Sequence, residues 1–254
     1  MFNYYGSKFK VSKFYPSPLH DLIIEPFAGA ASYSVLHRHK KVFLNDSYKT
    51  IADIWRWLIE EATQNEIMEN CHFTDGQSIK DLNLKIPHKN LIGFCINRGS
   101  AAPRNIVQRW SCQSKLDPDL ASSTKYRLLE IAKTIKHIKH WSVQCDDFKS
   151  LPNVRATWFI DPPYQHGGEH YVENKINYNE LAHWAKSRMG QVIVCENLSA
   201  NWLEFQPLRM NQGQRKKSTE AIFYQIDGKE IKEFSEYYRG QLEFREMEAG
   251  ESVN

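Results

Sequence analysis

Residues 156–164 read Ala-Thr-Trp-Phe-Ile-Asp-Pro-Pro-Tyr, an apolar run followed by an acid, two prolines and an aromatic ring. The apolar part predicts a buried strand, and the two prolines end it in a stiff loop because they fix φ and remove two backbone donors. Open α/β sheets bind ligands at this end of their strands. Asp161, the Pro162 carbonyl and the Tyr164 ring suit a planar group that carries an exocyclic amine. The alternative is a tight turn with a buried tyrosine.

A second stretch, near the N-terminus, combines a strand, a turn of small residues and a helix. Leu22-Ile23-Ile24 predicts a short buried strand, residues 25–32 (Glu-Pro-Phe-Ala-Gly-Ala-Ala-Ser) predict the turn, and residues 33–37 begin the helix. This order is typical of a Rossmann-like nucleotide site, because small residues let a ligand approach the backbone closely. The chain has no Gly-x-Gly-x-x-Gly motif, so an NAD site is not indicated.

Asp46 ends the next predicted strand, which covers residues 41–46. An acid at this place can bind the hydroxyls of a ribose. The alternative is a cap for the helix that begins near Tyr48. We favour the ribose role because the preceding loop already predicts a nucleoside there.

The remaining apolar segments extend the same pattern. A strand and turn are predicted at 141–148, strands at 190–197 and 219–224, and helices at 49–70, 125–139 and 179–188. Strands that alternate with helices indicate a mostly parallel sheet with helices on both faces. The sequence therefore predicts an α/β fold of the Rossmann-like kind.

Composition sets limits on the class of protein. A chain of 254 residues with 41% hydrophobic residues can form one large domain, or one domain with an insertion. Its five cysteines form no Cys-x-x-Cys pair, which argues against a disulfide framework or a zinc cluster and fits the reducing cytoplasm. The spacing of His166, His170 and His183 gives only a weak metal signal, so we expect no metal. No apolar run approaches the roughly 20 residues of a membrane span.

The alternation of strands and helices breaks between about residues 55 and 140, where the only clear strand candidate is 90–94. Such a break predicts an inserted, largely helical subdomain, flanked by two parts of one domain at 1–54 and 141–254. Residues 98–140 carry nine basic and three acidic side chains, whereas the whole chain has a net charge of only +3. This charge is either a solvated face or a surface for an anionic partner.

These features together resemble the Dam-like family of adenine-N6 DNA methyltransferases. The resemblance rests on Tyr5-Gly6-Ser7-Lys8, the loop 25–32, Asp46, Asp147-Phe148 and residues 161–164, in that order along the chain. Two small departures are Ser7 and Ala31, each at the place of a family glycine. Ala31 then requires either a negative φ or slight strain.

The resemblance implies an S-adenosylmethionine-dependent fold in which the insertion recognises the target. It assigns the cofactor to Tyr5, Gly6, Lys8, Glu25, Pro26, Phe27, Ala28, Gly29, Ala30, Asp46, Asp147, Phe148 and Asp161. Lys8 would pair with the cofactor carboxylate, and Asp147 would bind the adenine edge. A capped turn at Asp147 is an equally good interpretation.

The catalytic residues implied are Asp161, Pro162, Pro163 and Tyr164. We expect Asp161 and the Pro162 carbonyl to accept hydrogen bonds from the N6 amine of a flipped adenine while Tyr164 stacks on its ring. The expected partner is double-stranded DNA, bound by a monomer through Arg98, Arg104, Asn105, Arg109 and Lys216. The alternatives are transfer to cytosine N4 or to an amine in RNA, or an inactive DNA-binding module.

Overall fold

The computed structural model describes residues 2–97, 99–112, 123–212 and 217–232. Its centre is one mixed sheet with the strand order β3-β2-β1-β4-β5-β7-β6, and β8 is added beside β7. The strands are β1 (Leu22–Glu25), β2 (Lys41–Asn45), β3 (Ser142–Gln144), β4 (Ala156–Ile160), β5 (Gly190–Asn197), β6 (Gln206–Gln212), β7 (Lys217–Ile226) and β8 (Lys229–Glu230).

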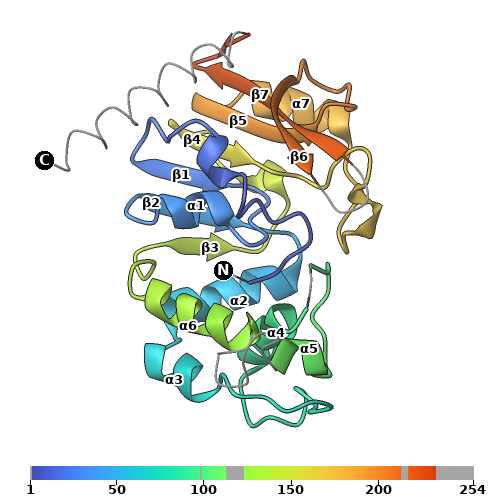
Figure 1. Ribbon diagram of the computed structural model, residues 1–254. Coiled ribbons are helices and arrows are strands. Elements are labelled where there is room, and N and C mark those ends of the chain that lie inside the picture. Colours follow the sequence, from blue (N-terminus) through green and yellow to red (C-terminus); the bar gives the residue numbers. More distant parts are fainter. Residues whose placement is uncertain (1, 98, 113–122, 213–216, 233–254) are drawn as a thin grey trace, which may run out of the picture.

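The first five strands are parallel, and the last three are antiparallel to their neighbours (Figure 1). The expected α/β class with a mostly parallel sheet is therefore confirmed, and the strands expected at 22–24, 41–46, 156–160 and 190–197 are all present. The polar strand β6 was not predicted from the sequence. Strand order reverses between β1 and β4, which are adjacent although a long stretch of chain separates them.

Both faces of the sheet are covered, as a parallel sheet requires. The alternation within β4 illustrates this, since Phe159 belongs to one hydrophobic cluster whereas Trp158 and Ile160 belong to the other. The helices are α1 (Ser32–Leu36), α2 (Lys49–Glu60), α3 (Gln64–Glu69), α4 (Ile86–Cys95), α5 (Arg109–Cys112), α6 (Ser123–Ile135) and α7 (Tyr178–Lys186), with short 3-10 turns at Ser12–Phe14, Phe148–Ser150 and Gly168–His170. Helix α7 packs in the second cluster, and α1, α2, α4 and α6 pack in the first.

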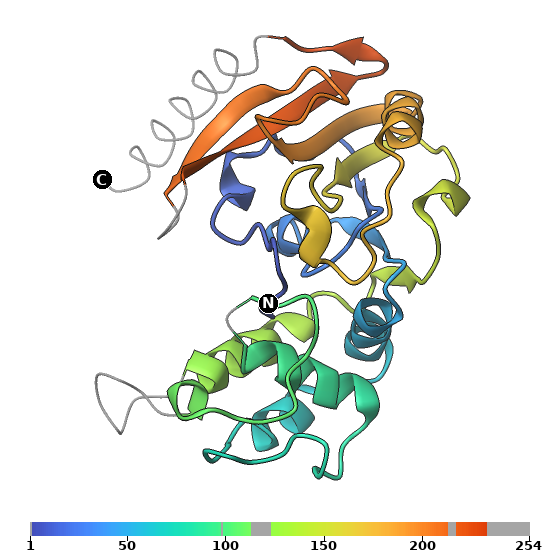
Figure 2. The ribbon, with the colours of Figure 1, turned by 90° about the vertical axis from the view of Figure 1, so that its right-hand side faces the viewer.

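Helices α3 to α6 lie together beyond β3, at the end of the sheet farthest from β6 (Figures 1 and 2). The strand expected at 90–94 is wrong, because these residues lie inside α4. Leu91, Ile92 and Cys95 recur at helical spacing and are fully buried, and Pro87 at the first turn favours the helix. A short apolar run does not distinguish a strand from a buried helix by periodicity alone.

The helical part shares its core with the sheet. Phe2 lies between Trp55 of α2 and Phe94 of α4, with ring centroids 5.9 and 5.6 Å away. Trp55 also packs on Trp141, which precedes β3. The boundary expected between the first part of the sheet domain and the insertion, at residues 54 and 55, falls within α2. Helix α2 packs against both β3 of the sheet and α4 of the helical part. Within the described residues, no helix is long and apolar enough to cross a membrane.

Candidate active site

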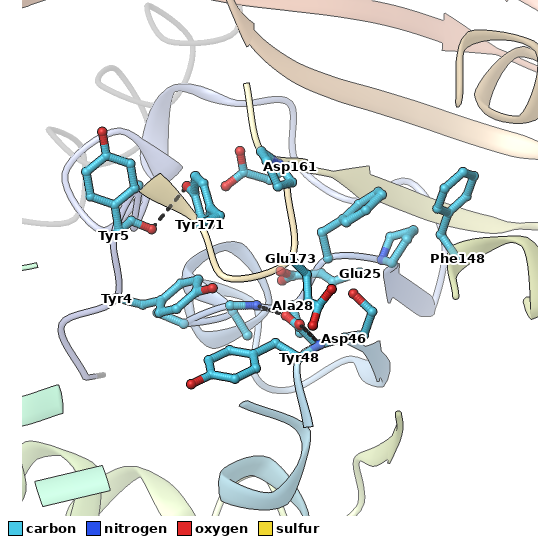
Figure 3. Close-up of a pocket in the computed structure, with 18 of the residues that line it drawn as sticks. Tyr4, Tyr5, Glu25, Ala28, Asp46, Tyr48, Phe148, Asp161, Tyr171 and Glu173 are labelled. Carbon is cyan, nitrogen blue, oxygen red and sulfur yellow. Dashed lines mark hydrogen bonds between the residues drawn. The ribbon is translucent and has the colours of Figure 1, made fainter. Parts of the chain in front are cut away.

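A pocket opens at the carboxyl ends of β1, β2 and β4, where the strand order reverses. Crevices at such switch points are the usual ligand sites of open α/β sheets. Every residue that the sequence assigned to a cofactor lines this pocket. Figure 3 shows Glu25, Asp46, Phe148 and Asp161 around one space, although they come from four separate segments of the chain.

The loop after β1 forms the floor of the pocket, and Glu25 anchors it. The Glu25 side chain is only 2% exposed, and its Oε1 accepts a hydrogen bond of 2.8 Å from the backbone N–H of Ser34 in α1. Burial raises the pKa of Glu25 to about 8, although this hydrogen bond opposes the shift. Ala31 takes the strained alternative, with φ of 45° and ψ of 43°, at a cost of roughly 1–2 kcal/mol.

Asp46 is held by two backbone N–H groups, and the N-cap of α2 is Tyr48 rather than Asp46. One carboxylate oxygen accepts from the backbone N–H of Tyr48, before α2, and the other from that of Gly29, both at 2.9 Å. The carboxylate thereby ties the loop after β1 to the start of α2 and still lines the pocket. Burial raises its pKa to about 6 against these two hydrogen bonds. Each oxygen keeps a second lone pair for a ligand hydroxyl.

Asp147 and Phe148 form the far wall. Asp147 caps the short turn Phe148–Ser150 by accepting a 2.8 Å hydrogen bond from Lys149 N–H, so the capped-turn interpretation is confirmed. Phe148 is buried against Phe27, with 5.4 Å between ring centroids. This wall offers a planar ligand an apolar face beside a carboxylate.

Asp161 and Lys8 form an ion pair in the lining of the pocket. Lys8 Nζ lies 2.8 Å from Asp161 Oδ1, and it also donates a hydrogen bond of 3.1 Å to the Gly6 carbonyl. Burial raises the pKa of Asp161 to about 6, and the attraction of Lys8 only partly offsets it. The lysine expected to meet the cofactor carboxylate therefore pairs with the expected catalytic acid.

The rest of the Asp-Pro-Pro-Tyr loop is held from several sides. Pro162 and Pro163 are buried, and the Pro163 carbonyl accepts a 2.9 Å hydrogen bond from the Tyr178 hydroxyl. Tyr164 is half-buried and donates from its hydroxyl to Glu220 Oε1. Pro163 lines the pocket, whereas Pro162 and Tyr164 lie beside it.

Sequence reasoning missed the segment that covers the pocket. Three of its residues line the pocket, just after the 3-10 turn Gly168–His170: Tyr171, Glu173 and Lys175. The Tyr171 hydroxyl donates to the Tyr5 carbonyl at 3.1 Å, and Figure 3 shows Glu173 beside Asp46. Nothing local in the sequence marks Tyr171, because its partner is 166 residues away.

The expected nucleic-acid contacts are exposed where the structure describes them. Arg104, Asn105 and Arg109 are exposed in or next to the loop between α4 and α5, whereas Arg98 and Lys216 lie outside the described residues. This loop is joined to the pocket wall, because Tyr4 forms a parallel bridge with Ser100 and Tyr5 N–H donates to the Ser100 carbonyl at 3.3 Å.

Replacing Glu25 with Gln is expected to flatten the pH dependence of stability. Between pH 4.5 and about 8, the folded wild type holds a proton on Glu25 that the unfolded chain has lost, so its free energy of unfolding falls as pH rises. Glutamine keeps an oxygen acceptor for Ser34 N–H and cannot ionise. Urea denaturation at pH 5 and pH 8.5 would measure the free energy of unfolding of both proteins. Relative to wild type, the variant should be more stable at pH 8.5 than at pH 5 by a few kcal/mol. Parallel losses in both proteins would contradict this assignment.

Replacing Gly6 with Ala is expected to loosen the covering segment. Gly6 has φ of 73°, and a Cβ there would overlap the Tyr171 hydroxyl. Gly76 is a matched control, since its φ is 78° and a Cβ meets nothing within 4 Å. Both variants should lose about 1 kcal/mol to backbone strain. Only Gly6→Ala should speed hydrogen exchange at 168–176, and equal exchange in both would show that Tyr171 does not depend on this contact.

No family model matches this chain, and no curated protein matches it. In the described part of the chain, no three His, Cys, Asp or Glu side chains gather as a metal site would require.

Proposed function

We propose that this protein transfers the methyl group of S-adenosylmethionine to the exocyclic amine of a nucleic-acid base, with N6 of adenine in double-stranded DNA as the favoured target. The observation that carries the proposal is the convergence of four separate segments on one pocket. The loop 25–32, Asp46, Asp147-Phe148 and Asp161, which the family resemblance assigns to the cofactor, all line this pocket.

The residues present fit a nucleoside cofactor. Asp46 is fixed by two backbone N–H groups and keeps acceptor capacity for ribose hydroxyls. Phe148 and Ile176 contribute apolar side chains to the lining for a base, and Asp147 contributes a carboxylate. Gly29, with φ of 44°, lets the chain pass close to Tyr4, where a Cβ would lie 3.0 Å from the ring. When bound, S-adenosylmethionine supplies an activated methyl group on a sulfonium.

The role of Asp161 is to accept a hydrogen bond from the target amine. The lone pair of an adenine amine is delocalised into the ring, which makes the nitrogen a poor nucleophile. A carboxylate that accepts one N–H bond favours a more tetrahedral nitrogen and stabilises the positive charge that develops on it. Burial of Asp161 strengthens this interaction, because little water competes for the carboxylate.

The covering segment and the loop between α4 and α5 complete the proposal. Tyr171 lines the pocket beside Tyr5 and Glu173 lines it beside Asp46, so this segment would shield part of a bound cofactor from water. Arg104, Asn105 and Arg109 provide cations and an amide for DNA on a loop bridged to the pocket wall at Ser100. The target base leaves the duplex to reach Asp161, at a cost of a few kcal/mol.

The test is to incubate the protein with methyl-labelled S-adenosylmethionine and either duplex DNA or RNA, then to identify the labelled nucleoside by mass spectrometry. N6-methyladenine from DNA is the expected product. Label in N4-methylcytosine, or in RNA only, would reassign the target and keep the chemistry. Cofactor binding without label in any nucleic acid would overturn the proposed reaction.

A further inference from the structure

Glu220 is a buried acid that neither the sequence motifs nor the proposed chemistry uses. It lies on β7, the antiparallel strand beside β5, and is only 6% exposed. Taking a carboxylate out of water costs several kcal/mol unless hydrogen bonds and an opposite charge compensate for it. The contacts of Glu220 therefore indicate what keeps it there.

Those contacts lead to the candidate catalytic loop. Glu220 Oε1 accepts hydrogen bonds from the hydroxyls of Tyr164 and Tyr15, the second at 2.6 Å, and lies 3.8 Å from Lys8 Nζ. Tyr164 is the last residue of the Asp-Pro-Pro-Tyr loop, and Lys8 is the partner of Asp161. Glu220 therefore contacts both Tyr164 and Lys8, the ion-pair partner of Asp161. Glu220 itself does not line the pocket.

The ammonium of Lys8 lies where an amine would have to arrive. It is 2.8 Å from Asp161 Oδ1 and 4.5 Å from the centroid of the Tyr164 ring. An exocyclic amine that bonds to Asp161 while its base stacks on Tyr164 would have to occupy the position that the Lys8 ammonium holds. The target and Lys8 therefore compete for Asp161, and Glu220 is a second carboxylate within reach of the displaced ammonium.

We propose that Glu220 is a positioning residue of the target site, an inference that rests on the proposed function. It acts in two ways, both through other residues. Its hydrogen bond to the Tyr164 hydroxyl fixes the orientation of the ring on which the base stacks. Its negative charge holds the Lys8 ammonium when the target amine replaces Lys8 as the partner of Asp161. Lys8 then stays in the site without blocking the Asp161 carboxylate.

The decisive variants are Glu220→Gln and Tyr164→Phe, alone and together. Glutamine keeps the size and a hydrogen-bond acceptor but removes the charge, and phenylalanine keeps the ring but removes the hydroxyl. Loss of one charge-assisted hydrogen bond predicts a rate of methyl transfer about 10- to 100-fold lower in a single turnover. The KM for DNA and the Kd of S-adenosylmethionine should each stay within about twofold of wild type, because Glu220 lies outside the cofactor pocket.

The double variant separates positioning from general damage. If Glu220 acts through Tyr164, the double variant should be no more than about twofold slower than Glu220→Gln. Tyr33→Phe is the stability control, because it removes a buried hydroxyl that donates to the Pro16 carbonyl at 2.6 Å, outside the pocket. It should lower the melting temperature and leave the transfer rate unchanged.

Three outcomes would overturn the inference: wild-type transfer by Glu220→Gln, losses that multiply in the double variant, or a cofactor Kd that weakens as much as the rate falls. Where Glu220→Gln does not fold, Tyr164→Phe decides alone, because a wild-type rate in that variant removes the link through the hydroxyl. Failure of the wild-type protein to methylate any nucleic acid would instead overturn the proposed function.

Discussion

Asp161→Ala is expected to lower methyl transfer by about a thousandfold while S-adenosylmethionine still binds. Removing one preorganised group that stabilises developing charge typically costs 10²- to 10³-fold in rate, and Asp161 is the only residue proposed to accept the target amine through its side chain. The cofactor would keep Asp46, Phe148 and the loop after β1, which hold their places through contacts that do not involve Asp161.

The fold should survive this change. Lys8 loses its partner at 2.8 Å but keeps Glu220 at 3.8 Å, so the buried ammonium is not left without an opposite charge. Asp161→Asn is the matched variant, because it preserves the size of the side chain and one carbonyl acceptor but not the charge. We expect Asn to retain more activity than Ala and less than wild type.

The measurement is a single-turnover assay with labelled cofactor, accompanied by a calorimetric titration of S-adenosylmethionine. Undiminished transfer by Asp161→Ala would remove Asp161 from the mechanism. A cofactor Kd that weakens as far as the rate falls would instead place Asp161 among the cofactor ligands.

The pocket could be predicted from the sequence to the extent that it is built from strand ends. Asp46 and Asp161 each follow an apolar run that predicts a buried strand, and parallel strands bring their carboxyl ends to one edge of a sheet. The turn of small residues after β1 is likewise a local signal. These features depend on a few neighbouring residues, so a single sequence is enough to locate them.

The contacts that set the electrostatics of the site could not be predicted in this way. Glu220 bonds to Tyr15, which is 205 residues away in the sequence, and to Tyr164, which is 56 residues away. These contacts depend on the pairing of β7 with β5 and on its register, and no local sequence pattern predicts either. The sequence around Lys8 is that of an N-terminal arm, in which a lysine is usually solvated. In the structure Lys8 is only 6% exposed and pairs with Asp161. Long-range packing decides which charges meet.

Lys8→Met is expected to be the most destabilising single change in the site. Methionine fills a similar volume but leaves Asp161 and Glu220 facing each other without a cation. Breaking a buried ion pair by removing one partner typically costs 3–5 kcal/mol, which for a chain of this size lowers the melting temperature by roughly 10 °C. Thermal denaturation at pH 8 would measure the loss.

The pH dependence of that loss identifies its cause. Burial already raises the pKa of Asp161 to about 6 with Lys8 present, and without the ammonium this pKa rises further. The folded variant therefore holds a proton at a higher pH than folded wild type does, so its deficit should be largest at pH 8 and shrink toward pH 5. Lys8→Met combined with Asp161→Asn should recover part of the stability at pH 8, because one uncompensated charge is gone. A deficit equal at both pH values, and unrelieved by Asp161→Asn, would assign the loss to packing around the lysine stem rather than to its charge.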